Sequence, residues 1–272
     1  MSTPFHPADL TFTPVADLGA GQRQNPYWDV ERLSRGPQPV PDWLVTDAAA
    51  VDTDLGMLKT GKEADCVVLE RAVPGGASCL LAAKRYRSQE HRQFHRSASY
   101  QEGRRTRRSR DARAIAKGTD HGKAVMAGQW AWAEWEALKR LWVAGLPVPY
   151  PVMIYGTELV MELITVDGEA APRLVNTRPE PALLAAYFAQ LREAMTVLAR
   201  HGWAHGDLSP YNVLAAGERL VIIDLPQVVD LAANPHAMEF LLRDCHNVCS
   251  WFQRRGLDVD EGELFAHLLG HI

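Results

Sequence analysis

Two carboxylates and one amide stand at a spacing that suits metal-assisted chemistry on a hydroxyl group. In the stretch HGDLSPYNVL, Asp207 precedes Asn212 by five positions, and the following apolar run, LVIIDLPQ, brings Asp224 twelve residues after Asn212. Each of these residues alone is more often a turn or cap residue. Together they provide one carboxylate to orient a hydroxyl or take its proton, and two oxygen ligands of the kind that Mg²⁺ binds.

Phosphoryl transfer requires these groups and a cation on the phosphates. Lys84 in LLAAKRY is expected on a strand between small apolar residues, with its ammonium held toward a pocket; the alternative is an ordinary strand-edge lysine. Glu134 shares a helix face with Leu138 and Leu141 at helical spacing, so it is the expected partner of Lys84. Glu136 falls on another face and is the reserve candidate.

Strands and helices must position these side chains. Residues 57–72 read as strand, turn and strand, and CLLAAKRYR reads as a further strand. A helix from about Val125 is stopped by Gly145 and Pro147, and two short strands follow in PVMIYGTELVMELI. Residues 165–179 read as a loop. Two amphipathic helices come later, one opened by Pro181 and one closed by Gly256.

This order of elements favours an α+β fold with a β-rich small lobe and an α-rich large lobe. The expected divisions are a proline-rich and partly irregular N-terminal arm over 1–50, with a short helix near 28–34, an N-lobe over 51–163 and a C-lobe over 164–272. The expected junction between the lobes lies near Met161–Thr165.

Composition limits the class of protein further. Lys and Arg total 29 against 33 Asp and Glu, so overall charge does not indicate a nucleic-acid binder. We find neither a signal-like N-terminus nor an apolar run long enough for a bilayer, which predicts a cytoplasmic protein without a membrane partner. The four cysteines are expected to be reduced. Cys245 and Cys249 are better explained as a buried pair on one helix face than as metal ligands.

A basic insertion is expected between the strand of Lys84 and the helix of Glu134, at about 85–123. Its centre, GRRTRRSRDAR, gathers arginines from Arg104 to Arg113. One interpretation is a solvated flexible loop. The other is a loop that contacts the phosphates of RNA or of a phosphorylated partner.

The combination of HGDLSPYNVL with IIDLPQ resembles the RIO family of atypical serine/threonine protein kinases, and the resemblance extends from about Leu58 to Phe252. TGKEAD resembles the family's phosphate loop, and the basic insertion its flexible loop. GLPVPYPV followed by LVMELI, and later NPHAMEFLLRDCHNV, resemble two further family segments. HGDLxxxN alone is not specific, because aminoglycoside and choline kinases carry similar loops.

The resemblance implies a two-lobed protein-kinase-like fold that binds ATP with Mg²⁺, or alternatively Mn²⁺. Lys84 would contact the phosphates and be held by Glu134. Asp207 would be the catalytic carboxylate, with Asn212 and Asp224 as metal ligands. Backbone groups around the hinge and side chains of the phosphate loop would contact the nucleotide: Met161, Glu162 and Ile164 at the hinge, and Thr60, Lys62 and Glu63 in the loop. An exposed hairpin turn is the alternative for the last three.

The chain departs from ordinary protein kinases in two ways. IIDLPQ replaces their DFG motif, and no APE-like segment precedes the next helix, so a peptide-docking activation segment is expected to be lacking. The DLPQ motif resembles the type-2 branch of the family. The later helix resembles the type-1 branch, and the N-terminal arm lacks a type-2 winged-helix pattern. The type-1 branch is the closer match.

Three functions fit these residues. The first is a RIO-type kinase or ATPase that phosphorylates protein hydroxyls, including its own. The second is an ATP-gated assembly factor that associates with ribosomal RNA through Arg104–Arg113. The third is a small-molecule phosphotransferase, which would need an acidic substrate pocket in the C-lobe; the short sequence after Asp244 leaves little room for one.

Overall fold

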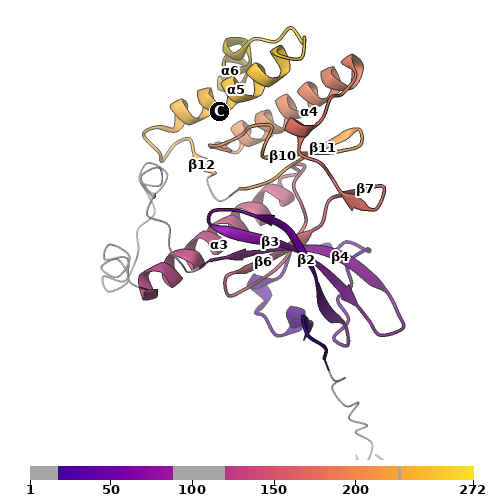
Figure 1. The fold of residues 1–272 in the computed structure, drawn as a ribbon. Helices are drawn as coiled ribbons and strands as arrows, with labels where there is room; N and C mark the ends of the chain where they lie inside the picture. Colours follow the sequence, from indigo (N-terminus) through magenta and orange to yellow (C-terminus); the bar gives the residue numbers. More distant parts are fainter. Residues whose placement is uncertain (1–17, 88–119, 226–227) are drawn as a thin grey trace, which may run out of the picture.

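The computed structural model describes residues 18–87, 120–225 and 228–272. These residues form two lobes, with a β-sheet in one and most of the helices in the other, and helix α3 (Asp120–Val143) lies between them (Figure 1). The expected α+β architecture is therefore confirmed. The arginine-rich stretch 104–113 lies outside the described residues. Among the described helices, none is long and apolar enough to cross a bilayer.

The N-lobe sheet has six strands in the order β1-β2-β3-β4-β6-β5, each antiparallel to its neighbour. Their bounds are Gln22–Gln24 (β1), Val51–Thr60 (β2), Ala64–Ala72 (β3), Ser78–Tyr86 (β4), Pro151–Tyr155 (β5) and Glu158–Glu162 (β6). The register sets Lys59 opposite Cys66, and Cys66 opposite Lys84. Directly opposed residues point to the same face of a sheet, so this register aligns two cations on one face.

Helix α3 ends where its sequence predicts. Gly145 adopts φ +81°, a conformation that glycine reaches without a Cβ clash. Its N–H donates to the carbonyl of Trp142, and the N–H of Leu146 donates to the carbonyl of Leu141. These two bonds form a Schellman motif, which satisfies the last carbonyls of the helix and turns the chain toward β5.

Part of the proline-rich N-terminal segment belongs to the N-lobe sheet. Strand β1 pairs with β2. The single short helix expected near 28–34 is instead two 3-10 turns, η2 (Pro26–Trp28) and η3 (Arg32–Ser34). Tyr27 and Leu44 are buried in a cluster with residues of β3, β4 and β5. This segment therefore covers the face of the sheet that is turned away from α3.

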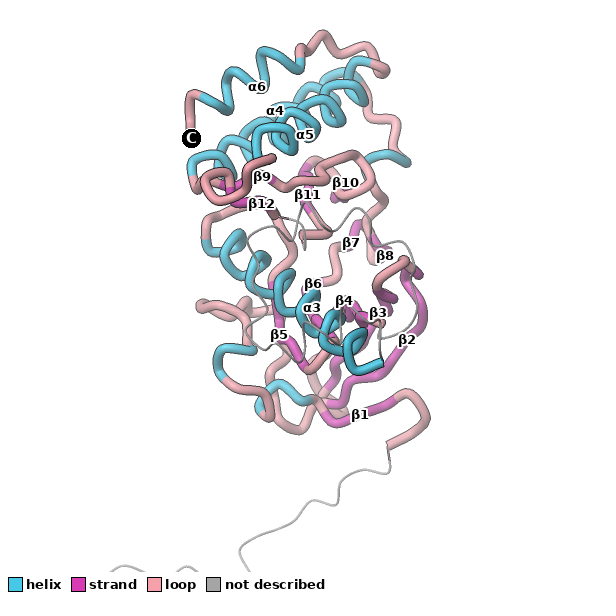
Figure 2. Tube along the Cα trace, turned by 90° about the vertical axis from the view of Figure 1, so that its left-hand side faces the viewer, coloured by secondary structure: helices cyan, strands magenta, loops and turns pink. Residues whose placement is uncertain are grey.

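The C-lobe packs three helices against short hairpins (Figure 2). The helices are α4 (Pro181–Arg200), α5 (Ala237–Gln253) and α6 (Glu261–Leu269). Strands β10 (Val213–Ala216) and β11 (Arg219–Ile222) form one hairpin, and β9 (Trp203–Ala204) pairs with β12 (Val229–Asp230). Pro181 opens α4, as predicted, and Cys245 and Cys249 are both buried on α5.

The segment 165–179 is more ordered than its sequence predicts. It contains the hairpin of β7 (Thr165–Val166) with β8 (Glu169–Ala170), followed by the 3-10 turn η5 (Leu174–Asn176). Strands of two residues carry too little periodicity to be recognised in a sequence. The hairpin matters because it leads from β6 into the C-lobe.

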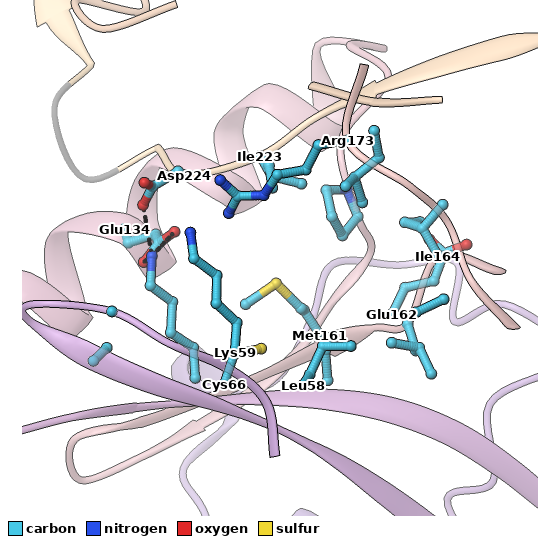
Figure 3. Close-up of a pocket in the computed structure, with 18 of the residues that line it drawn as sticks. Leu58, Lys59, Cys66, Glu134, Met161, Glu162, Ile164, Arg173, Ile223 and Asp224 are labelled. Atoms are coloured by element: carbon cyan, nitrogen blue, oxygen red, sulfur yellow. Dashed lines mark hydrogen bonds and ion pairs between the residues drawn. The ribbon is translucent and has the colours of Figure 1, made fainter. Parts of the chain in front are cut away.

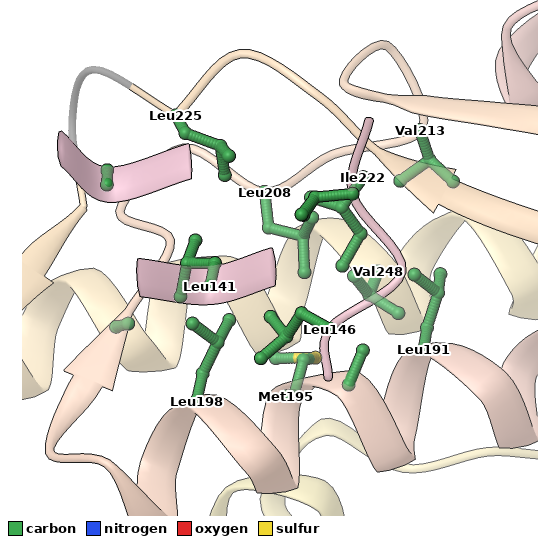
Figure 4. Packing of buried hydrophobic residues seen from close by; sticks show 14 of the residues in the cluster. Leu141, Leu146, Leu191, Met195, Leu198, Leu208, Val213, Ile222, Leu225 and Val248 are labelled. Atoms are coloured by element: carbon green, nitrogen blue, oxygen red, sulfur yellow. The ribbon is translucent and has the colours of Figure 1, made fainter. Parts of the chain in front are cut away.

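One hydrophobic cluster extends through both lobes. Leu141 of α3 and Leu146 just after it pack close to Met195 and Leu198 of α4 (Figure 4). The same cluster includes Leu159 of β6 and residues of α5. The lobes are therefore joined by a shared core as well as by the connecting chain.

An ion pair is fully buried within the N-lobe sheet. Arg71 on β3 lies opposite Asp52 on β2, and both side chains are shielded from solvent. The guanidinium donates to both carboxylate oxygens, from Nε at 2.6 Å and from Nη2 at 3.0 Å. A two-bond pairing of this kind offsets part of the cost of removing both charges from water.

We predict that Arg71→Met destabilises the protein by about 3 kcal/mol, because the buried Asp52 carboxylate then loses both of its hydrogen bonds and keeps only the 3.6 Å ion pair with Arg23. The measurement is the free energy of unfolding in urea, with exposed Arg178→Met as the control. The control is expected to change this free energy by less than about 0.5 kcal/mol. An unchanged unfolding midpoint for Arg71→Met would contradict the prediction.

Candidate active site

A cavity of about 610 Å³ opens between the sheet and the C-lobe. Its floor comes from β2, β3 and β4, and its far side comes from residues 161–164, 170–171, 173 and 223–224. Figure 3 shows charged side chains gathered at the end near Asp224, while Met161 and Ile164 lie toward the other end. The cavity is thus polar at one end and largely apolar at the other.

Lys84 lies at the polar end between two carboxylates. Its Nζ is 2.9 Å from Oε1 and 2.8 Å from Oε2 of Glu134, and 2.7 Å from Oδ1 of Asp224. Burial alone would lower the pKa of Lys84, but Glu134, Tyr86 and Asp224 outweigh burial and raise it well above its ordinary value. Lys84 in turn lowers the pKa of Asp224. Lys84 and Asp224 are therefore both ionised at neutral pH.

The structure brings Glu134 to Lys84 and keeps Glu136 away, as the helical spacing predicts. Glu136 pairs with Lys139 on its own helix. Glu134 is buried, and Tyr86 donates its hydroxyl hydrogen to Oε2 of Glu134. The backbone N–H of Leu225 also approaches Oε1 of Glu134, at 3.4 Å. One carboxylate therefore contacts both Lys84 and the chain that follows Asp224.

Asp224 reaches this position through an unusual backbone conformation. Strand β11 ends at Ile222, two residues before Asp224. Asp224 then adopts φ +67°, which non-glycine residues seldom do. Backbone conformations of this kind occur preferentially at functional sites. Here the left-handed residue directs the carboxylate toward Lys84.

The segment that begins the HGDLSPYNVL stretch is fixed by its own hydrogen bonds. His205 is buried, which lowers the pKa of its imidazole. Its Nδ1 accepts from the N–H of Asp207 at 3.3 Å, and its Nε2 contacts the carbonyl of Ile223 at 3.1 Å. A neutral imidazole with its proton on Nε2 satisfies both contacts. His205 therefore joins the Asp207 loop to the residue before Asp224.

Asn212 is hydrogen-bonded to Asp207 and to Ile223, the residue before Asp224. Its Nδ2 donates to the carbonyl of Asp207 at 2.9 Å, and its own carbonyl accepts from the N–H of Ile223 at 2.9 Å. Asp207 itself is exposed, and neither Asp207 nor Asn212 lines the cavity. The structure therefore places these two residues beside the polar end of the cavity, next to Asp224.

A buried carboxylate on α5 supports the same loop from behind. Asp244 is 1% exposed. Its two oxygens accept from the N–H groups of Gly206 and Leu208, both at 2.8 Å. Arg243 donates to the carbonyl of Gly206, and Asn247 donates to that of Leu208 at 3.1 Å. Four side-chain bonds from one helix thus hold the backbone on both sides of Asp207.

The remaining predicted residues lie at the cavity wall with one exception. Lys62, Glu63, Met161, Glu162 and Ile164 line it, whereas Thr60 does not. Lys62 and Glu63 are also exposed in the turn between β2 and β3, so the hairpin-turn alternative describes their local structure.

The segment 162–164, which connects β6 to the C-lobe, is held by hydrogen bonds at both ends. Glu162 is bonded to Tyr150 through its backbone N–H, at 2.9 Å, and through its carboxylate, at 3.0 Å. The carbonyl of Ile164 accepts a hydrogen bond from the N–H of Ala171, which directly follows the β7–β8 hairpin, at 2.8 Å.

Comparison with known proteins identifies the family. A family model described as "RIO domain" matches residues 79–264, which is more than half of the chain. This chain belongs to the RIO family. The RIO-type serine/threonine-protein kinase Rio1 of Haloferax volcanii is 38% identical over 220 residues, covering 81% of this chain and 70% of that protein. The membership that the motifs predict is confirmed.

More distant relatives agree with this assignment. Rio1 of Dictyostelium discoideum is 35% identical over 140 residues, which are 51% of this chain and 24% of that protein. The crystal structure of a Rio2 kinase–ADP/Mg²⁺–phosphoaspartate complex from Chaetomium thermophilum superposes with a TM-score of 0.57. That match has 22% identity and covers 79% of this chain and 60% of the other, so it shows the shared fold.

The polar end of this RIO-family cavity suits Mg²⁺. Asp224 presents a carboxylate of which Lys84 contacts only Oδ1. Asn212 uses Nδ2 for its bond to Asp207, so Oδ1 is the atom that it offers to a cation. Carboxylate and amide oxygens are the ligands that Mg²⁺ prefers. The donor set therefore fits the metal that the family resemblance implies.

Sequence reasoning missed four informative residues. Asp244 interrupts the apolar face of α5 between Leu241 and Val248, and a carboxylate in that position signals a buried partner. Three others line the cavity: Lys59, Cys66 and Arg173. Lys59 directly precedes the TGKEAD motif. Nothing in the local sequence indicates that Arg173 lines the same cavity as Lys59.

We predict that Asp244 makes stability depend on pH. Burial raises the pKa of Asp244 to about 7, although its two backbone bonds oppose that rise. A carboxyl whose pKa is raised on folding binds more protons in the folded state. Its contribution is therefore fully present below about pH 4 and is lost as pH rises toward 7.

The free energy of unfolding should accordingly fall relative to Asp244→Asn between pH 5 and 7, by at most about 1.4 kcal/mol per pH unit. Urea unfolding of both proteins at pH 5, 6 and 7 measures this difference. A difference that stays constant over this range would show that Asp244 is ionised throughout.

Proposed function

We propose that this protein is a Mg²⁺- and ATP-dependent serine/threonine kinase of the RIO type, which transfers the γ-phosphoryl group of ATP to protein hydroxyls, including its own. The observation that carries the proposal is the cluster of Lys84, Glu134 and Asp224 at the polar end of an elongated cavity. The apolar end offers a surface for a base, and the polar end offers charges for phosphates.

Each end of the cavity has a distinct part in nucleotide binding. The adenine would lie against Met161 and Ile164, with hydrogen bonds to the connecting backbone. Lys84 would contact the phosphates while Glu134 holds its ammonium in place. Mg²⁺ bound by Asp224 and Asn212 would neutralise phosphate charge and align the γ-phosphoryl group.

Asp207 is positioned for the acceptor rather than for the nucleotide. It is exposed beside the cavity, while the backbone on both sides of it is held by Asp244. A rigid loop with an exposed carboxylate suits the orientation of an incoming hydroxyl and the removal of its proton. Asp207 therefore serves as the catalytic carboxylate in this proposal.

The relatives support this choice of ligands and reaction. The Rio1 protein of H. volcanii is named a serine/threonine-protein kinase, and the C. thermophilum Rio2 structure contains ADP and Mg²⁺. An RNA-associated role through Arg104–Arg113 stays a prediction from the sequence, because those arginines lie outside the described residues.

We predict that Asp207→Asn lowers the rate of phosphoryl transfer by roughly 10²- to 10⁴-fold with little change in nucleotide affinity. The substitution removes the carboxylate that acts on the acceptor hydroxyl and leaves the nucleotide-binding residues unchanged. Asp224→Asn should lower the rate and also weaken Mg²⁺-dependent ATP binding. The assay follows γ-labelled phosphate from ATP to the protein and to water.

Asp258→Asn is the matched control for both variants, because Asp258 is exposed and distant in sequence from the loop and the metal ligands. It should retain the wild-type rate. Wild-type transfer by Asp207→Asn, or by Asp224→Asn, would remove that residue from the proposed role.

A further inference from the structure

Two cationic side chains in the cavity, Lys59 and Arg173, have no role in the phosphoryl transfer proposed above. Lys59 comes from β2 in the N-lobe, and Arg173 comes from the segment between β8 and η5. Figure 3 shows both side chains pointing into the cavity, with their charged groups near Asp224. They approach from different walls, one from the sheet and the other from the side of the C-lobe.

These two cations differ from Lys84 in how they are paired. Lys84 contacts two carboxylates within 3 Å. Within the described part of the chain, the side chains of Lys59 and Arg173 form no hydrogen bond or ion pair within the usual distance limits. A cation that lines a cavity without a carboxylate partner retains its capacity to bind an anion there.

The charges around Lys59 are unbalanced. Burial lowers its pKa, and Arg173 has the largest effect among the neighbouring charges, ahead of the opposing effect of Asp224; Lys84 lowers the pKa further. Lys59 and Arg173 therefore repel each other across the cavity. An anion placed between them would replace this repulsion with two attractions.

We infer that Lys59 and Arg173 form an anion-binding pair that takes the terminal phosphates of the nucleotide from the two lobes at once. The inference deepens the proposed ATP site and rests on it. The planar guanidinium of Arg173 suits two-bond contact with a phosphate, and the ammonium of Lys59 adds a compact charge. The register of the sheet places Lys59 in line with Lys84, on the same face.

Phosphate binding by this pair would also bridge the lobes. Lys59 is part of the long β2 strand of the N-lobe sheet. Arg173 is held to the C-lobe by a β-bridge with Leu214. A phosphate that contacts both cations therefore links a strand of one lobe to a fixed segment of the other. Adenosine, which has no phosphate, makes no such link.

The test measures binding of inorganic tripolyphosphate, ATP and adenosine to the full chain by calorimetry. Lys59→Met and Arg173→Met should each weaken tripolyphosphate and ATP roughly tenfold, the loss expected for one charged hydrogen bond. Adenosine affinity should not change. Lys59→Arg should restore most of the tripolyphosphate binding, because it returns the charge.

Arg178→Met is the matched control, an exposed arginine five positions after Arg173 that does not line the cavity. It should bind all three probes as the wild type does, and a thermal unfolding scan checks that each variant is folded. Unchanged tripolyphosphate affinity in both Lys59→Met and Arg173→Met would overturn the inference.

The three probes separate this inference from the proposed function. A wild type that binds tripolyphosphate through Lys59 and Arg173 but binds neither ATP nor adenosine would retain the anion pair and refute the kinase proposal. A wild type that binds ATP and adenosine but not tripolyphosphate, with ATP affinity unaffected by either substitution, would refute the anion-binding pair and leave the kinase proposal standing. Failure to bind any probe would refute both.

Discussion

The contact of Lys84 with Glu134 and Asp224 is the interaction on which the site depends, because its three members come from three separate parts of the fold. Lys84 belongs to the sheet, Glu134 to α3, and Asp224 to the chain that follows β11. A buried charge needs a partner of opposite sign. The partners here can meet only when the sheet, the helix and the C-lobe are packed together, so the polar end of the cavity is complete only in the folded protein.

The C-lobe contributes a second constraint, which acts on backbone groups. The loop before β10 exposes Asp207 yet carries N–H groups that point inward. Buried N–H groups require acceptors, and Asp244 supplies both of its oxygens to Gly206 and Leu208. A carboxylate buried on α5 thereby stabilises the conformation of an exposed carboxylate on the loop.

The sequence predicts the site best where the signal is local. The spacing of Asp207, Asn212 and Asp224 is visible in one stretch of chain, and helical periodicity is enough to choose Glu134 over Glu136. Periodicity also predicts the long strands and helices, because each has a continuous buried face. The two-residue strands β7 and β8 are too short to show such a pattern.

Other features depend on contacts between distant segments. The position of Lys59 and Arg173 on the wall of one cavity follows from how the lobes pack, and no spacing within either segment predicts it. The left-handed conformation of Asp224 is likewise set by its surroundings, since aspartate adopts it only occasionally. These are properties of tertiary structure, which a single sequence does not display.

The hydrophobic cluster shared by Leu141, Leu146 and the α4 residues has a mechanical consequence. Two lobes that were joined only by a single connecting segment could rotate apart as rigid bodies. Separating these lobes would instead expose apolar surface to water, at a cost that rises with the area uncovered. Entry and exit of a ligand should therefore proceed through small movements of the cavity's rim, such as the turn between β2 and β3, while the shared core stays closed.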